Sequence, residues 1–363
     1  MTRCCSALLC IAVALTTLAS AQGDVTLGDV TLIVAGDVTL GGHYQEYVDE
    51  QIKKGQPPDE AISRGFEKVG KVTREADVFL VNLEGPFTER GEMIYKNFNF
   101  RARPEFVAAL AAGGVDIVSL ANNHMMDYGS DGLDDTISTL DDGGIQHFGA
   151  GASLADARHP VILEVKGVRV AFLGYLFLGG QHPEPYEIFA TDDHPGAAGH
   201  YDDVDAVRSM IEDDIRVAKE QADHVIPFFH WGREGRPDPE PYQVALAHAA
   251  IDAGASAVLG SHPHNLQGIE VYNGAPIAYS LGNFVFGGRW NPPDKRTALL
   301  ELKLSKTGVT STKVIPAYTD SFPKEPFQPY IVHGSDAEVL KRYVAQLSAA
   351  FPQTLASLGR GRH

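Results

Sequence analysis

Cysteine is almost absent from this chain of 363 residues. The three cysteines are Cys4, Cys5 and Cys10, so everything after position 10 is free of thiols. Disulfide bonds, thiolate metal sites and a cysteine nucleophile are therefore excluded from the main part of the chain. A metal ion there must be held by histidine, aspartate, glutamate or asparagine.

A basic surface is lacking as well. The chain carries 30 lysines and arginines against 47 aspartates and glutamates, a formal net charge of −17, and no block of basic residues stands out. This balance argues against nucleic acid as a partner, because binding to a phosphate backbone depends on clustered cations. The acidic surface would also repel a polyanionic substrate, except where bound cations reverse the local field.

The first 21 residues have the pattern of a secretory signal peptide. They contain an arginine at position 3, an apolar run over 7–18 and the sequence Ala19-Ser20-Ala21, which fits an A-x-A cleavage site. The apolar run is shorter than the roughly 20 residues that a membrane span requires. We therefore expect cleavage before Gln22, export to the periplasm or the medium, and no membrane span in the mature chain.

Beyond residue 30, apolar segments of strand length alternate with amphipathic segments of helix length. This alternation is typical of an α/β fold. Strands are predicted at 32–35, 77–81, 115–120, 225–229 and 255–259, and helices at 60–76, 104–112, 133–140, 202–222 and 242–253. Further strands are predicted at 161–165, 168–175, 297–304 and 310–316.

The distribution of these elements predicts one domain over residues 31–320, without a second core. Residues 22–30, where the sequence Gly-Asp-Val-Thr-Leu repeats, are expected to form a flexible lead-in. Residues 321–363 are predicted to be a C-terminal extension with a helix at 337–351 and a disordered tail.

Two segments break the alternation. Residues 179–201 are rich in glycine, proline, histidine and aspartate and predict a long surface loop. The histidines of this loop are expected to face solvent: His182, His194 and His200. Residues 266–272 and 275–286 flank Asn273-Gly274, a dipeptide that favours a two-residue hairpin turn.

Polar side chains follow five of the predicted strands at the point where each strand ends. They are Asp37, Glu84, His124, His230 and His262. In α/β sheets, ligands bind beyond the carboxyl ends of the strands. The five positions therefore predict one functional site.

The sequence His262-Pro263-His264 follows the strand predicted at 255–259. Pro263 disfavours the helical region for His262, and residues two apart in an extended chain point the same way. Both imidazoles are therefore expected to converge on one point, where they could bind a metal ion. The predicted hairpin would support this loop from behind.

Six residues supply a set of metal ligands: Asp37, Glu84, Asn123, His230, His262 and His264. Two carboxylates, one amide and three imidazoles suffice for two metal ions that share a bridging ligand. Such oxygen and nitrogen ligands suit Zn, Mn or Fe(II). Two cations about 4 Å apart lower the pKa of a shared water and stabilise an oxyanion, so the set predicts hydrolytic chemistry.

Six motifs in this order resemble a known family: GDVTLGG, NLEGPFT, ANNHMMDYGSDGL, HWGREG, GSHPHNLQGIE and YSLGNFVF. Over residues 31–287 the chain is similar to the capsule-synthesis CapA family of poly-γ-glutamate synthesis proteins, within the calcineurin-like metallophosphoesterase superfamily. The resemblance implies a four-layer α/β/β/α sandwich with a metal site at one rim.

The resemblance also implies a role for each residue of the site. The ligands of the first metal would be Asp37 and His264, those of the second Asn123, His230 and His262, with Glu84 as the bridge. His124 would protonate the leaving group, and Asp127 would orient it. Near the site, Arg101, Arg233 and Glu234 are candidate substrate contacts, with rim salt bridges as the alternative.

Two departures from the superfamily bear on the reaction. Its first motif is Asp-x-His, but Thr39 holds the place of that histidine, and His43 is the nearest candidate to replace it. The bridging place, usually an aspartate, is held by the longer Glu84. Phosphoesterase activity therefore does not follow from the resemblance.

These observations predict an exported metalloprotein that acts in the synthesis or processing of a poly-γ-glutamate-type capsule polymer. The expected reaction is hydrolysis of an amide or ester with two divalent ions. Two alternatives remain open: a metal-dependent phosphoesterase, and a non-catalytic scaffold of a capsule-export complex with a structural metal. Expected partners are the polymer or its precursor and capsule synthesis or export proteins.

Overall fold

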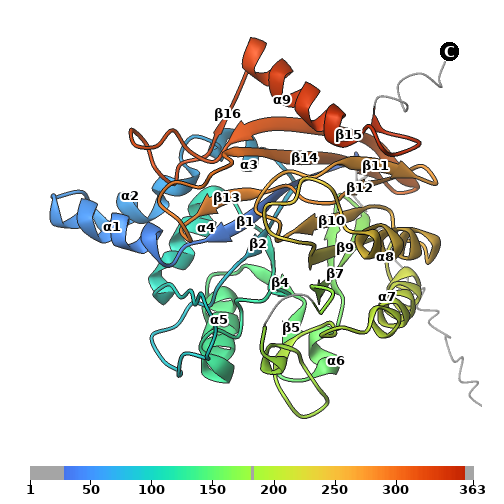
Figure 1. The fold of residues 1–363 in the computed structure, drawn as a ribbon, viewed down its shortest axis with the longest axis horizontal. Coiled ribbons are helices and arrows are strands. Elements are labelled where there is room, and N and C mark those ends of the chain that lie inside the picture. Colours follow the sequence, from blue (N-terminus) through green and yellow to red (C-terminus); the bar gives the residue numbers. More distant parts are fainter. Residues whose placement is uncertain (1–27, 181–183, 356–363) are drawn as a thin grey trace, which may run out of the picture.

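Two β-sheets face each other in the computed structural model, which describes residues 28–180 and 184–355 (Figure 1). The predicted signal peptide, most of the predicted lead-in, His182 and the end of the predicted tail lie outside these ranges.

The first sheet has eight strands in the order β16-β15-β14-β1-β2-β3-β4, with β13 paired to β1. Strands β1 to β4 are parallel, and β14 to β16 extend the sheet antiparallel. In chain order the strands are β1 (Val30–Thr39), β2 (Val78–Leu83), β3 (Ile117–Ser119), β4 (Gln146–Phe148), β13 (Asn283–Phe286), β14 (Arg296–Ser305), β15 (Gly308–Tyr318) and β16 (Tyr330–Ile331).

The second sheet has six strands in the order β11-β12-β10-β9-β7-β6, of which the four central ones are parallel. They are β6 (Val161–Val165), β7 (Val168–Phe177), β9 (His224–Trp231), β10 (Val258–Ser261), β11 (Ile269–Tyr272) and β12 (Ala275–Ala278). A separate pair is formed by β5 (Ala150–Gly151) and β8 (Gly196–Ala197).

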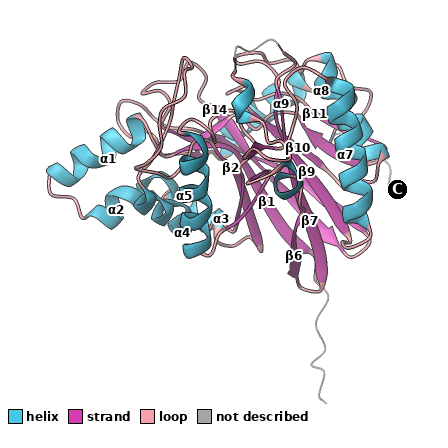
Figure 2. Cartoon of the chain, turned by 90° about the horizontal axis from the view of Figure 1, so that it is seen from below, coloured by secondary structure: helices cyan, strands magenta, loops and turns pink. Residues whose placement is uncertain are grey.

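Helices cover the outer faces of both sheets (Figure 2). The helices over the first sheet are α1 (His43–Lys53), α2 (Pro58–Ser63), α3 (Gly70–Thr73), α4 (Val107–Gly113) and α5 (Gly129–Asp142). Those over the second are α7 (Val204–Lys219) and α8 (Pro241–Asp252). The remaining ones are α6 (Leu154–Ala157), α9 (Gly334–Leu347) and the 3-10 turns η1 (Arg64–Phe66), η2 (Pro104–Phe106) and η3 (Tyr186–Ile188).

Three apolar cores separate four layers. Alternate residues of a strand point to opposite faces, so β1 sends Leu32 and Val34 into the core between the sheets and Ile33 towards the helices of the first sheet. Strand β7 likewise sends Phe172 inwards and Leu173 towards α7 and α8. Because both faces are covered, the central strands are nearly continuous apolar runs in the sequence. The predicted α/β/β/α sandwich is confirmed.

Residues 60–76, predicted as one helix, form the three pieces α2, η1 and α3 instead. The buried hydroxyl of Tyr44 explains the first break, because it donates to Ile62 O at 2.6 Å and accepts from Gly65 N at 3.0 Å. These contacts occupy backbone groups that a continuous helix would pair internally. A Cβ at position 65 would also lie 2.9 Å from that hydroxyl.

The predicted hairpin around Asn273-Gly274 is present, but its second arm ends early. Strands β11 and β12 pair antiparallel, and both turn residues have positive φ, 48° and 83°. After Ala278 the chain leaves the second sheet, turns at Gly282 with φ of 74°, and continues as β13 in the first sheet. Gly36 permits this crossing, because a Cβ there would lie 1.8 Å from Gly282 O.

The described part of the predicted surface loop, residues 179–180 and 184–201, contains regular structure and buried residues. It contains η3 and β8, and Ile188 and Ala197 are buried in the core beneath the first set of helices. His194 and His200 are half-buried rather than fully exposed.

The predicted C-terminal helix is present as α9, and Val344 on it packs into the core between the sheets. Among the described residues, no helix combines the length and the apolar character that crossing a membrane requires.

Candidate metal centre

The polar residues at the strand ends lie together at one rim of the sandwich. Asp37 lies near the end of β1, Glu84 directly follows β2, and His230 is the second-to-last residue of β9. Asn123 follows β3, and His262 follows β10. All five are at most 3% exposed, so each is removed from bulk water, and a polar group without a partner there is costly.

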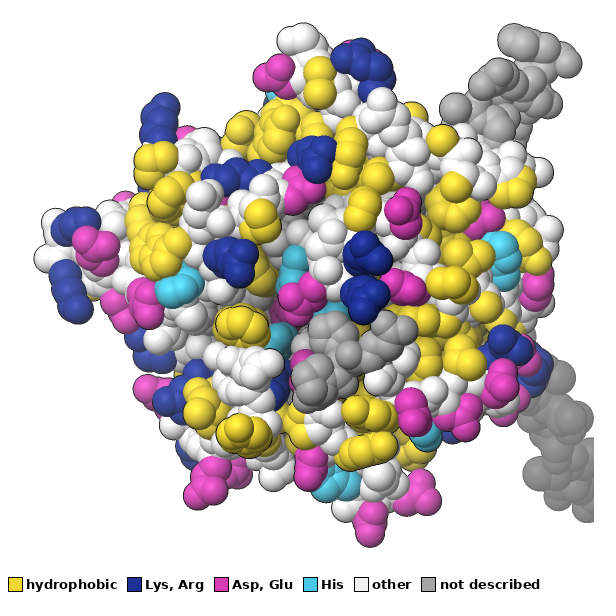
Figure 3. Space-filling model, viewed as in Figure 1, with side chains coloured by type: hydrophobic (Ala, Val, Ile, Leu, Met, Phe, Trp, Pro, Cys, Tyr) yellow, Lys and Arg dark blue, Asp and Glu magenta, His cyan; other side chains and the backbone are white. Residues whose placement is uncertain are grey.

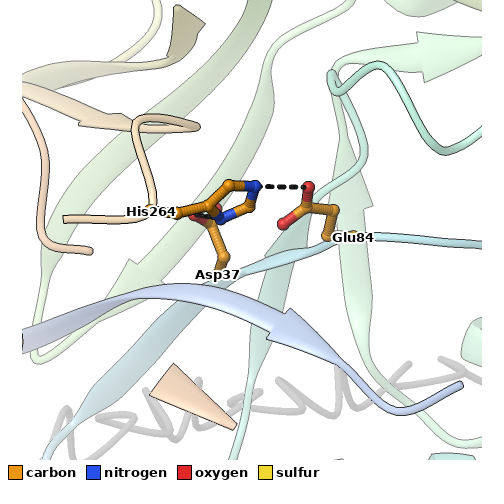
Figure 4. A group of neighbouring side chains, drawn as sticks. All are labelled: Asp37, Glu84 and His264. Atoms are coloured by element: carbon orange, nitrogen blue, oxygen red, sulfur yellow. Dashed lines mark ion pairs between the residues drawn. The ribbon is translucent and has the colours of Figure 1, made fainter. Parts of the chain in front are cut away.

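Asp37, Glu84 and His264 form one group, with ligand atoms that all lie within 4.8 Å of one another. In Figure 4 the imidazole of His264 lies beside both carboxylates. Its Nδ1 lies 3.4 Å from Asp37 Oδ2, and its Nε2 lies 3.8 Å from Glu84 Oε1. Two carboxylates and an imidazole that converge in this way can hold a divalent cation.

The charges of this group shift its pKa values in different directions. Burial and the negative charge of Asp37 raise the pKa of Glu84 well above its usual value. Burial works against a charged His264, but the charge of Glu84 and the hydrogen bond and charge of Asp37 outweigh it and raise the pKa of His264 to about 10. Burial would raise the pKa of Asp37, but His264 outweighs it and leaves that pKa lowered. In the metal-free protein, a proton on His264 therefore offsets part of the negative charge of the two carboxylates.

The residues of this group fit a metal ion. Both carboxylate oxygens of Glu84 are buried, and no described residue forms a hydrogen bond with either. A buried polar group without a partner costs about 1–3 kcal/mol, and more when it is charged. A cation bound to Glu84 would give these oxygens the partner that the protein does not supply.

Asn123, His230 and His262 form a second group of ligand atoms. His230 Nε2 lies 2.9 Å from Asn123 Oδ1 and 3.0 Å from His262 Nδ1. Burial lowers the pKa of His230 to about 3, so its imidazole is neutral, the form in which histidine binds metals. The other ring nitrogen of His230 lies 3.1 Å from Ser261 Oγ, which fixes the ring.

The loop that carries His262 and His264 differs from the extended chain that was predicted. Both residues are left-handed, with φ of 95° and 57°, although Pro263 follows the first of them. The rings therefore diverge, with His262 facing His230 and His264 facing Asp37. Left-handed backbone at residues other than glycine is strained and persists only where its surroundings hold it. Here the N–H of His262 donates to Asp37 Oδ2 at 3.3 Å.

Three buried asparagines hold the ligands in place. Asn82 Nδ2 donates to Asp37 Oδ1 at 2.9 Å, and Asn122 Nδ2 donates to Asn82 Oδ1 at 3.1 Å. Asn283 Oδ1 lies 2.8 Å from His264 Nδ1 and so contacts the loop that carries this histidine. Sequence reasoning missed Asn82 and Asn122, although they stand two residues before Glu84 and one residue before Asn123.

His124 lies beside both groups. Its Nδ1 is 2.7 Å from Asp127 Oδ2, its Nε2 is 3.8 Å from Glu84 Oε1, and the ring of Phe100 lies 4.4 Å from its own. Burial lowers the pKa of His124, and the charge of Asp127 offsets this only in part. At neutral pH the imidazole is therefore uncharged and able to accept a proton.

A cavity of about 530 Å³ opens next to His124 and His264. Figure 3 shows histidine and acidic side chains together near the centre of this face. Of the three predicted substrate contacts, Glu234 lines the cavity. Arg101 and Arg233 are exposed outside its lining, and the guanidinium of Arg101 lies 4.4 Å from the centre of the Tyr128 ring.

Neither Thr39 nor His43 supplies the missing imidazole. Thr39 is fully buried, and its Oγ1 has no hydrogen-bond partner among the described residues. His43 begins α1 at the surface, where its Nδ1 lies 2.8 Å from Glu46. The first group thus has a single histidine, His264.

Sequence reasoning also missed Lys96 and Glu184, which lie behind the site. Glu184 Oε1 accepts a hydrogen bond from Asn123 Nδ2 at 2.9 Å, and Lys96 Nζ lies 2.8 Å from Asp127 Oδ1. Neither residue follows a strand or belongs to a periodic segment, so the sequence carries no signal for them.

Residues 31–288 match the family model described as bacterial capsule synthesis protein PGA_cap. The capsule biosynthesis protein CapA of Bacillus anthracis is 34% identical over 293 residues, which cover 79% of this chain and 67% of that protein. The PGA biosynthesis protein CapA of Bacillus subtilis is 36% identical over 284 residues, covering 77% and 69%. The predicted resemblance to the CapA family is thereby confirmed.

Among solved structures, the chain is similar to a phosphatase from Mycoplasma pneumoniae. The TM-score is 0.46 and the sequence identity 13%, over 80% of this chain and 94% of that one.

Replacing Glu84 by glutamine is expected to stabilise the metal-free protein at pH 8. The pKa of Glu84 is higher in the folded protein than in the unfolded protein. Below the unfolded-state pKa both states are protonated, and the folded protein keeps its full stability. As the pH rises from there towards the folded-state pKa, the unfolded state releases the proton first and the free energy of unfolding falls. Glu84→Gln has no such loss. Its unfolding free energy in urea, with a chelator present, should exceed that of the wild type by about 1–3 kcal/mol at pH 8 and by less at pH 5.

The matched control is Glu60→Gln, which changes an exposed glutamate. It should leave the unfolding free energy unchanged at both pH values. A destabilised Glu84→Gln variant at pH 8 would contradict the account of this carboxylate.

Proposed function

Because the chain belongs to the bacterial capsule synthesis protein PGA_cap family, we propose that it is an exported metal-dependent hydrolase in the synthesis or processing of a poly-γ-glutamate-type capsule polymer. The names of the relatives, which refer to capsule and PGA biosynthesis, support the polymer or its precursor as substrate. The observation that carries the proposal is the buried carboxylate of Glu84, which has no hydrogen-bond donor among the described residues and stands beside Asp37 and His264. Capsule synthesis or export proteins are the expected partners.

Two divalent ions, of Mn, Zn or Fe, would be held by the two groups of ligands. Asp37, Glu84 and His264 would hold the first, and Glu84 would also contact the second. Asn123, His230 and His262 would hold the second, since His230 Nε2 lies 2.9 Å from Asn123 Oδ1 and 3.0 Å from His262 Nδ1. When bound, such a pair lowers the pKa of a shared water and stabilises negative charge on the attacked group.

His124 is the acid-base residue in this proposal. Asp127 holds Nδ1 as a donor, so Nε2 of the neutral imidazole is the acceptor. In hydrolysis of an amide, Nε2 takes the proton that the attacking water gives up. It then passes that proton to the leaving nitrogen as the C–N bond breaks, while the oxygen of the water stays on the new carboxylate.

An amide or ester is favoured over a phosphate ester because of the two departures from the superfamily. Thr39 leaves the first group without the second histidine, and Glu84 reaches further from its strand than an aspartate would. Both changes alter the place where a phosphate would be held.

Metal analysis tests the centre directly. The purified mature protein is expected to contain about two equivalents of Mn, Zn or Fe by elemental mass spectrometry. His262→Ala should lose one equivalent, and the double variant with His264→Ala should lose both. Because His264 and Glu84 must release protons when they bind a cation, the affinity of the metal-free protein for Mn²⁺ should rise from pH 6 to pH 8.

His43→Ala is the matched control, because it removes a surface histidine near the same rim, and it should keep the full metal content. A double variant that keeps both equivalents of metal would contradict the proposed metal centre.

Activity is expected against poly-γ-glutamate or γ-glutamyl amides, measured as shortening of the polymer and release of amines. His124→Ala should slow the metal-loaded protein by about 10²–10⁴-fold without loss of metal, because the proton transfer is lost. Removal of the metal should abolish turnover.

A chromogenic phosphate ester should be assayed beside these substrates. Turnover of that ester alone would identify a phosphoesterase instead. A metal-loaded protein that turns over neither substrate but binds capsule-export proteins would be a scaffold.

Export is proposed from residues 1–21. When the full chain is expressed in a bacterium, the protein recovered from the periplasm or medium should have the intact mass of a chain that begins at Gln22. A chain that retains Met1 and stays inside the cell would contradict this expectation.

A further inference from the structure

A buried ammonium lies behind the metal centre. The side chain of Lys96 is 4% exposed, and its Nζ lies 2.8 Å from Asp127 Oδ1 and 3.2 Å from Glu184 Oε2. The same ammonium donates to Asn123 O at 2.6 Å. The contact to Asn123 O is a hydrogen bond, and the contacts to the two carboxylates are ion pairs. A cation removed from water is retained only where charges and hydrogen bonds replace its hydration, so these partners account for its position.

Lys96 is connected through Asp127 to His124, and we call this chain of contacts the first arm. The second oxygen of Asp127 lies 2.7 Å from His124 Nδ1 and accepts from Phe100 N at 2.6 Å. With one oxygen facing Lys96 and the other facing the imidazole, the carboxylate of Asp127 has a single orientation. The direction of the His124 ring follows from it.

Lys96 is also connected through Glu184 to Asn123, and we call this chain of contacts the second arm. Glu184 Oε1 accepts from Asn123 Nδ2 at 2.9 Å, while its Oε2 faces Lys96. Because the amide nitrogen is held on this side, the amide oxygen must point the other way, where it lies 2.9 Å from His230 Nε2. An amide without this partner could rotate and offer its nitrogen, which cannot bind a cation.

We propose that Lys96 and Glu184 are positioning residues that fix the Asn123 oxygen for the second metal and the His124 ring for the reaction. The inference rests on the proposed function. Glu184 acts on Asn123 alone, whereas Lys96 acts on both arms, because its charge lets the two carboxylates lie around one point. Neither side chain is among the proposed metal ligands.

Titration of the metal-free protein with Mn²⁺, followed by calorimetry, tests this role. Glu184→Ala should weaken one of the two Mn²⁺ equivalents by about ten- to a hundredfold, the usual loss when a partner of a ligand is removed. Glu184→Gln should fall between the wild type and Glu184→Ala, because its one carbonyl oxygen can serve either Asn123 or Lys96 but not both. Lys96→Met should weaken the same equivalent.

Glu187→Ala is the matched control, since Glu187 is an exposed glutamate three residues further on, and it should bind as the wild type does. Melting temperatures of the metal-free variants are measured in parallel. If Glu184→Ala and Glu184→Gln lower only the melting temperature and leave both Mn²⁺ affinities unchanged, the pair is structural and the inference fails while the proposed function stands. If the wild type binds none of Mn²⁺, Zn²⁺ and Fe²⁺, the proposed function fails and the inference fails with it.

Discussion

The contact between the end of β1 and the turn at Gly282 decides where the centre forms. The N–H of Asp37 donates to Gly282 O at 3.0 Å, and only a glycine at position 36 lets that carbonyl come so near. Since the chain passes from the second sheet to the first at Gly282, this contact joins the sheets at the rim. Asn283, the next residue, pairs with Asp37 across β1 and β13 and holds His264 by its ring nitrogen. The backbone contact between Asp37 and Gly282 thus positions Asp37, and the side chain of Asn283 then positions His264.

The joined rim gathers charges that the protein alone does not balance. Glu84 is buried, with no hydrogen-bond donor in the part of the chain that the structure describes, and the raised pKa of His264 reflects its place among carboxylates. Such an arrangement lowers the stability of the metal-free fold, a common consequence of a site built for function. The strained backbone at His262 also lowers the stability of the fold, and it directs the His262 ring towards His230. Both features are understandable if the folded state is completed by cations.

The sequence was informative where periodicity and chain direction determine the result. Asp37, Glu84 and His230 lie together at one rim because each stands at or near the end of a buried strand, and parallel strands of two facing sheets end there. The sequence was not informative where a contact with a side chain far away in the sequence changes the local structure. The helix expected at 60–76 is broken by the hydroxyl of Tyr44, and the pattern of the helix itself contains no trace of that contact. Lys96 and Glu184 lie in irregular segments, so only the folded chain shows that they meet.

The acidity of the chain gives the proposed cations a second purpose. With a net charge of −17, the protein would repel a polymer that carries a carboxylate on every unit. Two arginines, Arg289 and Arg296, line the cavity beside the site, but Arg296 is engaged by Asp294 and Glu234 adds a negative charge. Two divalent ions would outweigh the charges of Asp37 and Glu84 and make the rim locally positive. On the proposed function, binding of the substrate and its hydrolysis would therefore depend on the same ions, and loss of the metal should weaken capture of the polymer as well as turnover.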